Sequence, residues 1–486
     1  MRKQTYYLGI GALAVLVGAL AVTNQSLWID EGAAALKAME PTLSGWWHNL
    51  RSEGNSNLQL LGELFWLWGW VKIFGASEIA LRASNIPFFA GGVLALAWGL
   101  GPRRRLQTAV VLLALTNAFL WYYLSEARPY LVLFGFASLT AACLFRVVCA
   151  PKESLESAAW FRLFCLGIIG LCATSMIAVP WALGAIGAVL YWSGPRAVAR
   201  CALRQKISSL LLTAAVAGLA LYYFWTLRLG ARASDVGRTG WMNTVFIFYE
   251  LLGLGGLGPG RLALRAIGPD ALRAFLPLLV VGAGTLLALL LPAFVTLRSR
   301  TKWRHIFFFA LAVAAPFLLV IAAGISGHVR LLGRHLTPLL PFLLAFLAFG
   351  LDTFISATVR WKRILAVGFL TVFLISALAI RLDPRFRRDD YRTAAAIARD
   401  AIHSGQSVWW LADVSTGLYY QVPFASPQLT IGSDLPGPNA PPDVVIYSKP
   451  DIYDSSGFVR PYLEGKGFTV QRVLPAFEIL TRPPVR

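Results

Sequence analysis

The chain has 486 residues, of which 57% are hydrophobic and 14% are charged, and its formal net charge is +20. So much apolar sequence at this length excludes a soluble globular protein and indicates a polytopic membrane protein. Basic residues at membrane surfaces and in cytoplasmic loops account for the charge, so no nucleic-acid partner is inferred. The five cysteines lie in or beside apolar runs, so no disulfide framework is implied.

Apolar runs predict eleven membrane spans, which places the N-terminus in the cytoplasm and the C-terminus outside. The first run follows Met1-Arg2-Lys3 and is interpreted as an uncleaved first span. Two of the runs, 162–175 and 177–193, are short for full crossings, which usually need about 20 residues. The expected spans are 6–23, 79–99, 107–124, 129–149, 162–175, 177–193, 207–226, 274–296, 305–324, 335–355 and 363–381.

The run from Leu58 to Phe74 decides the topology. Its three tryptophans, interrupted by Glu63 and Lys72, favour a helix that lies in the membrane interface rather than one that crosses. With that interpretation the basic clusters fall on a single side, which we take as cytoplasmic. These clusters lie at residues 2–3, 103–105, 196–206, 298–304 and 360–363.

The predicted topology divides the chain into a transmembrane domain, residues 1–381, and an outer α/β domain, residues 382–486. Residues 24–78 form the first outer loop, with its interfacial helices. The glycine-rich segment 253–260 lacks the context of a nucleotide loop and is interpreted as a flexible outer loop. The tail predicts a helix from Asp389, strands at 407–411 and 443–447, a helix near 458–465 and a strand at 468–480.

Two adjacent carboxylates, Asp30 and Glu31, follow the first span on the outer side. The functional interpretation makes Asp30 a catalytic base, with Glu31 as its hydrogen-bonding or metal-binding partner. The alternative is helix capping, because acids often stabilise the first turn of a helix.

A second polar cluster, Ser125 to Tyr130, joins two spans and contains Glu126 and Arg128. Charges beside lipid are costly unless they are paired or used in function. The alternative to a functional role is a local ion pair between Glu126 and Arg128.

A third cluster is cationic and lies outside, against the usual charge bias. An anionic ligand such as a lipid phosphate would explain it, since arginine offers bidentate donors. Ordinary anionic headgroups are the alternative ligand, and the two histidines are equally compatible with plain loop positions. The cluster comprises Arg228, Arg232, Arg238, His328, Arg330, Arg334 and His335, and a further polar group, Glu53, Asn55 and Asn57, is placed to contact an acceptor.

The order of these features resembles the GT-C glycosyltransferases, specifically bacterial relatives of protein O-mannosyltransferases and of the lipid A aminoarabinose transferase. The resemblance rests on four short motifs and covers residues 1 to about 380, with a weaker likeness in the tail. The motifs are Asp30-Glu31 after the first span, Phe74 to Arg82 (FGASEIALR), Ser125 to Tyr130 (SEARPY) and Gly333 to Pro341 (GRHLTPLLP).

The resemblance implies a polytopic GT-C fold and an enzyme that takes a sugar from a polyprenyl-phosphate donor at the periplasmic face of a bacterial inner membrane. It maps the essential acid onto Asp30, beside Glu31, and a second acid onto Glu126. Such enzymes often need a divalent cation, so Mg²⁺ or Mn²⁺ held by Asp30 and Glu126 is expected. The expected substrate contacts are Glu53, Asn57, Arg128, Tyr130, Arg330, Arg334 and His335.

Transfer to a hydroxyl of a glycan, lipid or protein acceptor requires a base and stabilisation of the leaving phosphate. A single displacement would invert the anomeric centre. A lipid-linked oligosaccharide polymerase and a lipid or sugar flippase remain as alternatives. Few ionisable residues lie deep in the spans, which disfavours an ion-coupled transporter.

Overall fold

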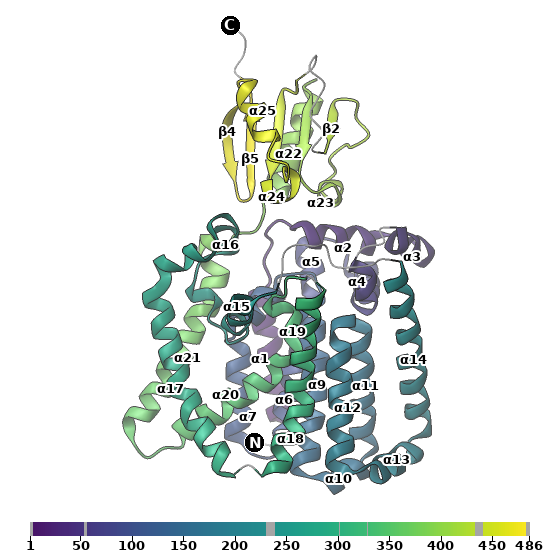
Figure 1. The fold of residues 1–486 in the computed structure, drawn as a ribbon, viewed down its shortest axis with the longest axis vertical. Coiled ribbons are helices and arrows are strands. Elements are labelled where there is room, and N and C mark those ends of the chain that lie inside the picture. Colours follow the sequence, from purple (N-terminus) through teal and green to yellow (C-terminus); the bar gives the residue numbers. More distant parts are fainter. Residues whose placement is uncertain are drawn as a thin grey trace.

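The fold is a helical membrane domain with a smaller sheet domain stacked on one end (Figure 1). The computed structural model describes residues 3–52, 56–229, 239–300, 302–327, 329–432 and 441–482. The chain begins at the end of the helical bundle that lies farthest from the sheet domain (Figure 1). The basic helix α13 (Pro195–Arg204) and the short helix α10 (Pro151–Glu156) also lie at that end.

Nine helical segments among the described residues are long and apolar enough to cross a membrane, and each matches an expected span. They are α1 (Lys3–Ala21), α5 with α6 (Glu78–Ala83, Ile86–Gly99), α9 (Tyr130–Cys149), η2 with α12 (Met176–Ala178, Val179–Ser193), α14 (Lys206–Arg228), α16 with η4 and α17 (Arg261–Ile267, Gly268–Phe275, Leu276–Arg300), α18 with η5 and α19 (Trp303–Phe309, Ala310–Ala314, Ala315–Ser326), η6 with α20 (Gly333–Leu339, Leu340–Ile355) and α21 (Arg360–Leu382). The short expected span at 162–175 is α11 (Ala158–Thr174), which is apolar but falls below the length of a full crossing.

The remaining expected span, 107–124, is broken. Helices α7 (Arg104–Leu115) and α8 (Ala118–Leu124) meet at an angle of 53°. Asn117 stabilises the break, because its side chain accepts a hydrogen bond from Leu120 N–H at 3.2 Å and donates to the Leu251 carbonyl at 3.1 Å. The bend directs α8 into the Ser125–Tyr130 turn.

Three short helices, α2 (Ile29–Met39), α3 (Leu43–Ser52) and α4 (Leu61–Phe74), lie between the spans and the sheet domain (Figure 1). The 14 residues of α4 are too few to cross, as expected for an interfacial helix. Its three indoles donate to backbone carbonyls, from Trp66 to Ser84, from Trp68 to Glu40 and from Trp70 to Ala80. These bonds fix α4 against its neighbours at the end of the bundle.

The segment predicted as a flexible glycine-rich loop is instead packed tightly against α21 and the residues that follow it. A Cβ added at Gly256 would lie 1.8 Å from the Ser376 carbonyl oxygen, and one at Gly260 would lie 1.8 Å from that of Arg385. Glycine is therefore needed for close backbone approach rather than for mobility. The connection contains α15 (Trp241–Leu251) and η3 (Gly255–Leu257), and it delivers Arg261 to the end of the bundle.

The C-terminal domain is an α/β domain with a five-stranded sheet in the order β2-β1-β3-β5-β4. Strand β1 (Val408–Leu411) is parallel to both β2 (Leu429–Ile431) and β3 (Val444–Ser448), whereas β5 (Phe477–Thr481) is antiparallel to β3 and β4 (Thr469–Leu474). The segment expected as a single strand at 468–480 is instead a hairpin of β4 and β5. Ala476, in the turn between these strands, has a positive φ of 66°. The helices are α22 (Tyr391–His403), α23 (Val414–Tyr419), α24 (Pro450–Tyr453) and α25 (Val459–Gly465), after η7 (Pro384–Phe386).

The C-terminal domain docks on the first outer loop through α23. Gly32 in α2 has no room for a side chain, because an added Cβ would lie 2.7 Å from Thr416 Cα. Tyr420 accepts a hydrogen bond from Leu27 N–H at 2.8 Å, and its hydroxyl also lies 3.0 Å from Glu78 Oε1. The two domains therefore meet beside the Asp30-Glu31 pair.

We predict that Gly32→Val loosens this contact and lowers the free energy of unfolding by about 1–3 kcal/mol, because the new side chain meets backbone that cannot retract. Limited proteolysis between residues 383 and 390, with thermal unfolding, measures the effect. Gly69→Val is the matched control, since an added Cβ in α4 meets nothing within 4 Å. Equal protease resistance of both variants would contradict the docking.

Candidate active site

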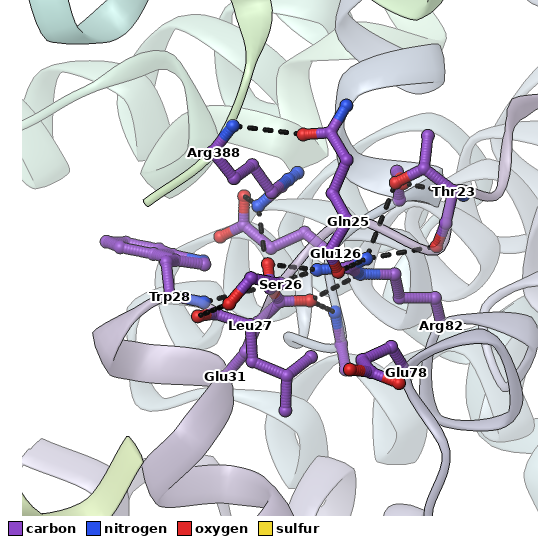
Figure 2. Close-up of polar contacts among 12 residues, drawn as sticks. Thr23, Gln25, Ser26, Leu27, Trp28, Glu31, Glu78, Arg82, Glu126 and Arg388 are labelled. Carbon is purple, nitrogen blue, oxygen red and sulfur yellow. Dashed lines mark hydrogen bonds and ion pairs between the residues drawn. The ribbon is translucent and has the colours of Figure 1, made fainter. Parts of the chain in front are cut away.

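A fully buried ion pair between Glu31 and Arg82 organises the end of the helical bundle (Figure 2). Arg82 Nε lies 2.9 Å from Glu31 Oε1, and Arg82 Nη2 lies 2.8 Å from Oε2. The same carboxylate accepts hydrogen bonds from the backbone N–H of Ala127 at 2.9 Å and of Trp28 at 3.4 Å. Although burial alone would raise the pKa of Glu31, Arg82 and Arg388 lower it, so Glu31 is ionised.

Arg82 uses its remaining donors on the chain segment that leads into α2. It donates to the carbonyls of Thr23 at 3.0 Å, Gln25 at 2.6 Å and Ser26 at 3.1 Å (Figure 2). Glu31 occupies the third position of α2 and bonds back to the residue before the helix, as in a capping box. The capping alternative therefore describes Glu31, while Asp30 is left with its side chain outside this network.

The Glu126 carboxylate pairs with Arg388, with Oε2 at 3.3 Å from Nη1, and not with Arg128. Arg388 lies in the interdomain linker, residues 383–390, which joins α21 to α22. The local Glu126–Arg128 ion pair considered from the sequence is therefore wrong. Glu126 is fully buried, and its Oε1 has no hydrogen-bond partner among the described residues. Arg128 instead donates to the Asp30 carbonyl and to Asn57 Oδ1, both at 3.3 Å.

The Asp30 carboxylate forms no hydrogen bond with any described residue, but cations surround it. Burial would raise its pKa, and the charges of four basic side chains outweigh burial and hold that pKa below 3.8. Asp30 is therefore an anion at neutral pH. The four basic side chains, in decreasing order of effect, are Arg128, Arg334, Arg261 and Lys449.

Several buried donors in this region have no partner within the described part of the chain. They are Trp28 Nε1, Arg128 Nε, and both Nε and Nη1 of Arg334. Three cations also approach the Trp28 ring, with Arg261 Cζ at 4.5 Å, Arg334 Cζ at 5.6 Å and Lys449 Nζ at 6.0 Å from its centroid. Unpartnered donors and excess positive charge are the features of an anion site.

Two neighbouring pockets open beside Arg388. One has an empty volume of about 340 Å³ and lies between Trp28, Tyr122, Arg261 and the linker residues 386–389. The other, of about 290 Å³, lies between the linker, the end of α1 and Ser125. Tyr122, Phe386 and Arg388 line both, so the linker residues separate the two spaces.

The structure brings together only some of the other residues expected at the site. Tyr130 is buried beneath Arg334, with its ring centroid 5.6 Å from Cζ, and His335 Nδ1 accepts a hydrogen bond from Leu332 N–H at 3.1 Å. Arg330 is exposed and is not among the main charges that act on Asp30. Arg228 is engaged with the Phe224 ring. Glu53, Asn55, Arg232, Arg238 and His328 lie outside the described residues.

The arrangement does not suit the divalent cation implied by the resemblance. No group of three or more His, Cys, Asp or Glu side chains among the described residues could hold a metal ion. The field at Asp30 is also positive, which would repel Mg²⁺ or Mn²⁺.

Sequence reasoning missed several charged residues of the site. Arg82 stood in a quoted motif without a role, and nothing marked Arg261, Arg388 or Lys449, which come from α16, the linker and the C-terminal domain. Glu63 was interpreted only as an interruption of an apolar run. It is buried, its Oε2 has no partner among the described residues, and burial raises its pKa to about 7.

Comparisons with known proteins give a fold. No family model and no curated protein sequence matches the chain. Among solved structures it is similar to ArnT of Cupriavidus metallidurans in the apo state, with a TM-score of 0.56 and 12% identity over 99% of this chain and 98% of that one. ArnT bound to undecaprenyl phosphate gives a TM-score of 0.53 at 12% identity, covering 99% of each chain. The chain has an ArnT-like fold. The likeness extends through the C-terminal domain, beyond the weak likeness expected there.

We predict that Glu31→Gln lowers the free energy of unfolding by about 3–5 kcal/mol, because it leaves the Arg82 guanidinium buried without a counter-charge. Thermal and denaturant unfolding in detergent measure the loss. The double variant Glu31→Gln/Arg82→Met should recover part of it, since both charges are removed. Glu464→Gln, in an exposed pair with Arg460, is the control. Wild-type stability with lost turnover in Glu31→Gln would instead assign Glu31 to the chemistry.

We predict that the protonation of Glu63 makes stability depend on pH. Its folded-state pKa of about 7 lies above the ordinary 4.5, so the folded protein binds this proton more tightly than the unfolded chain. The stabilisation is complete below pH 4.5 and is lost as the pH rises through 7, by about 3 kcal/mol in total. Unfolding temperatures from pH 4.5 to 8 should show this slope in the wild type and a shallower one in Glu63→Gln. Parallel curves would contradict it.

Proposed function

We propose that this protein is a membrane glycosyltransferase that moves a sugar from a polyprenyl-phosphate donor to an acceptor hydroxyl. The observation that carries the proposal is the Asp30 carboxylate, which has no hydrogen bond among the described residues and lies in a field of four cations. The fold supports it, because ArnT, a lipid A aminoarabinose transferase, shares the architecture and one of its structures contains undecaprenyl phosphate.

The basic side chains around Asp30 would bind the phosphate of the donor. Arg128 and Arg334 have buried N–H groups without a partner among the described residues, and Arg261 stacks on Trp28 beside them. Charge-assisted hydrogen bonds from arginine to phosphate oxygens would satisfy these donors. They would also stabilise the negative charge that the phosphate gains as its bond to the sugar breaks. A divalent cation has no part in this scheme.

Asp30 would accept the proton of the acceptor hydroxyl. In the proposed step the acceptor oxygen attacks the anomeric carbon, the bond between that carbon and the phosphate oxygen breaks, and the phosphate leaves with the electron pair. The acceptor proton passes to Asp30, and the single displacement inverts the anomeric centre. A carboxylate with a lowered pKa is a weak base, but the bound phosphate would offset the surrounding positive charge and raise that pKa.

The other two acids have supporting roles in this proposal. The Glu31 carboxylate accepts hydrogen bonds from Arg82 and from two backbone N–H groups. Glu31 therefore positions the first turn of α2 and thereby Asp30. Glu126 keeps Oε1 unpartnered within the described residues and can accept a hydrogen bond from the acceptor. Tyr130 forms the wall beneath Arg334.

The distribution of basic loops supports a site on the far side of the membrane from the N-terminus. In a bacterial inner membrane this puts α2, the site and the C-terminal domain at the periplasmic face and the N-terminus in the cytoplasm. The isoprenoid tail would then remain in the bilayer while its phosphate reaches the ends of the helices. The acceptor, whether glycan, lipid or protein, would approach from the periplasm.

We predict that Asp30→Asn lowers kcat by about 10²- to 10⁴-fold. Donor affinity should be kept or improved, because removing an anion beside the phosphate strengthens the local positive field. The measurement is transfer from a panel of radiolabelled polyprenyl-phosphate sugars to membrane acceptors, with binding of undecaprenyl phosphate measured in parallel.

Asp270→Asn is the matched control, because Asp270 is exposed in an ion pair with Arg273. Wild-type turnover in Asp30→Asn would remove Asp30 from the mechanism. Products that grow by whole repeat units would identify a polymerase, and transport without transfer would identify a flippase. Either result would replace the proposed function.

A further inference from the structure

Lys449 holds an unusual position in the C-terminal domain. It follows β3 directly and precedes α24, with φ 42° and ψ 75°, in the left-handed region that favours glycine. Its side chain is only 4% exposed, although lysine is rarely buried. A strained backbone conformation combined with a buried charge is typical of residues in functional sites.

The side chain of Lys449 points to the junction of the two domains. Its ammonium group pairs with Asp389 in the linker and lies 6.0 Å from the Trp28 ring centroid and 5.9 Å from that of Tyr391. It is one of the four cations that act on the Asp30 carboxylate, and the only one from the C-terminal domain. Asp389 also lines the pocket between Trp28 and the linker.

The sheet topology places Lys449 at the end of the sheet where domains of this kind usually bind ligands. The connection after β1 leads to β2 on one side, while β3 lies on the other, so the strand order reverses between β1 and β3. Ligands of α/β sheets bind outside the carboxyl ends of the strands at such a reversal. Lys449 lies at that end of β3, and α23, which follows β1, packs on Gly32 of α2. Figure 1 shows α23 and α24 at the end of the domain nearest the bundle.

We propose that the C-terminal domain completes the donor site by supplying Lys449 as a ligand for the phosphate of the lipid-linked sugar. This inference rests on the proposed function and extends it, since the phosphate would be held from both domains at once. Asp389 holds the ammonium group before the donor binds. The bound phosphate then takes over part of that ion pair, as a second anion beside Trp28.

An ordinary interdomain ion pair would give a different mutational pattern. If Lys449 and Asp389 only joined the domains, removing either charge would be equally harmful. If Lys449 binds phosphate, the cation alone matters for donor affinity, and removing Asp389 frees it. Arg265 in α16 and Asp451 in α24 supply the comparison, since they form a more exposed interdomain pair at 2.5 Å.

The experiment uses the full-length protein in nanodiscs, with undecaprenyl phosphate as the binding probe and the transfer assay for donor KM and kcat. Lys449→Met should raise the Kd of undecaprenyl phosphate and the donor KM at least tenfold. Lys449→Arg should retain most of the affinity. Asp389→Asn should leave the Kd unchanged or lower it, and Asp451→Asn should leave it unchanged. The double variant Lys449→Met/Asp389→Asn, which buries no unpaired charge, should bind as weakly as Lys449→Met.

Two results would overturn the inference while leaving the proposed function intact. One is an active wild type with unchanged Kd and KM in both variants that lack Lys449. The other is equal loss in Lys449→Met and Asp389→Asn with recovery in the double variant, which would identify a structural pair. Absence of transfer by the wild type from any polyprenyl-phosphate sugar would instead be a failure of the proposed function.

Discussion

The buried ion pair between Glu31 and Arg82 is the interaction on which the rest of the site depends. Arg82 binds the carbonyls of the segment that leaves α1, and Glu31 binds the backbone of Trp28 and Ala127. One charged pair therefore fixes the start of α2, the end of α1 and the turn after α8 relative to one another. Because both partners are fully buried, the loss of Glu31 leaves Arg82 with no other ion-pair partner among the described residues, as a charge that the surrounding structure cannot hydrate.

That constraint leaves Asp30 free to face the cations. Adjacent residues of a helix point in different directions, so Glu31 can be locked in the interior while Asp30 is directed toward Arg128, Arg334, Arg261 and Lys449. The site therefore has excess positive charge around Asp30, and several of its buried N–H donors have no hydrogen-bond partner in the described part of the chain. A phosphate diester would correct both the charge and the hydrogen bonding, and it would do so beside a carboxylate able to take a proton.

Much of this architecture could be predicted from the sequence, because each span is a continuous apolar run that is visible locally in the chain. The Asp30-Glu31 and Ser125 to Tyr130 motifs were visible for the same reason. The sequence could not divide the roles of Asp30 and Glu31, since that division depends on Arg82, which lies 51 residues from Glu31. Arg388 comes from the linker and Lys449 from the C-terminal domain, and contacts distant in sequence, such as that of α23 with Gly32, bring them close. The hairpin at 469–481 was missed because the left-handed Ala476 is not a typical turn residue.

We infer that the excess positive charge around Asp30 binds a lipid phosphate. The most direct measurement compares the binding of undecaprenyl phosphate and of uncharged undecaprenol to the purified wild-type protein in nanodiscs, over a range of salt concentrations. We predict saturable binding of the phosphate that weakens as salt rises, and no binding of the alcohol at the same concentrations. Equal binding of both lipids would show that the site recognises the isoprenoid alone and would contradict the account.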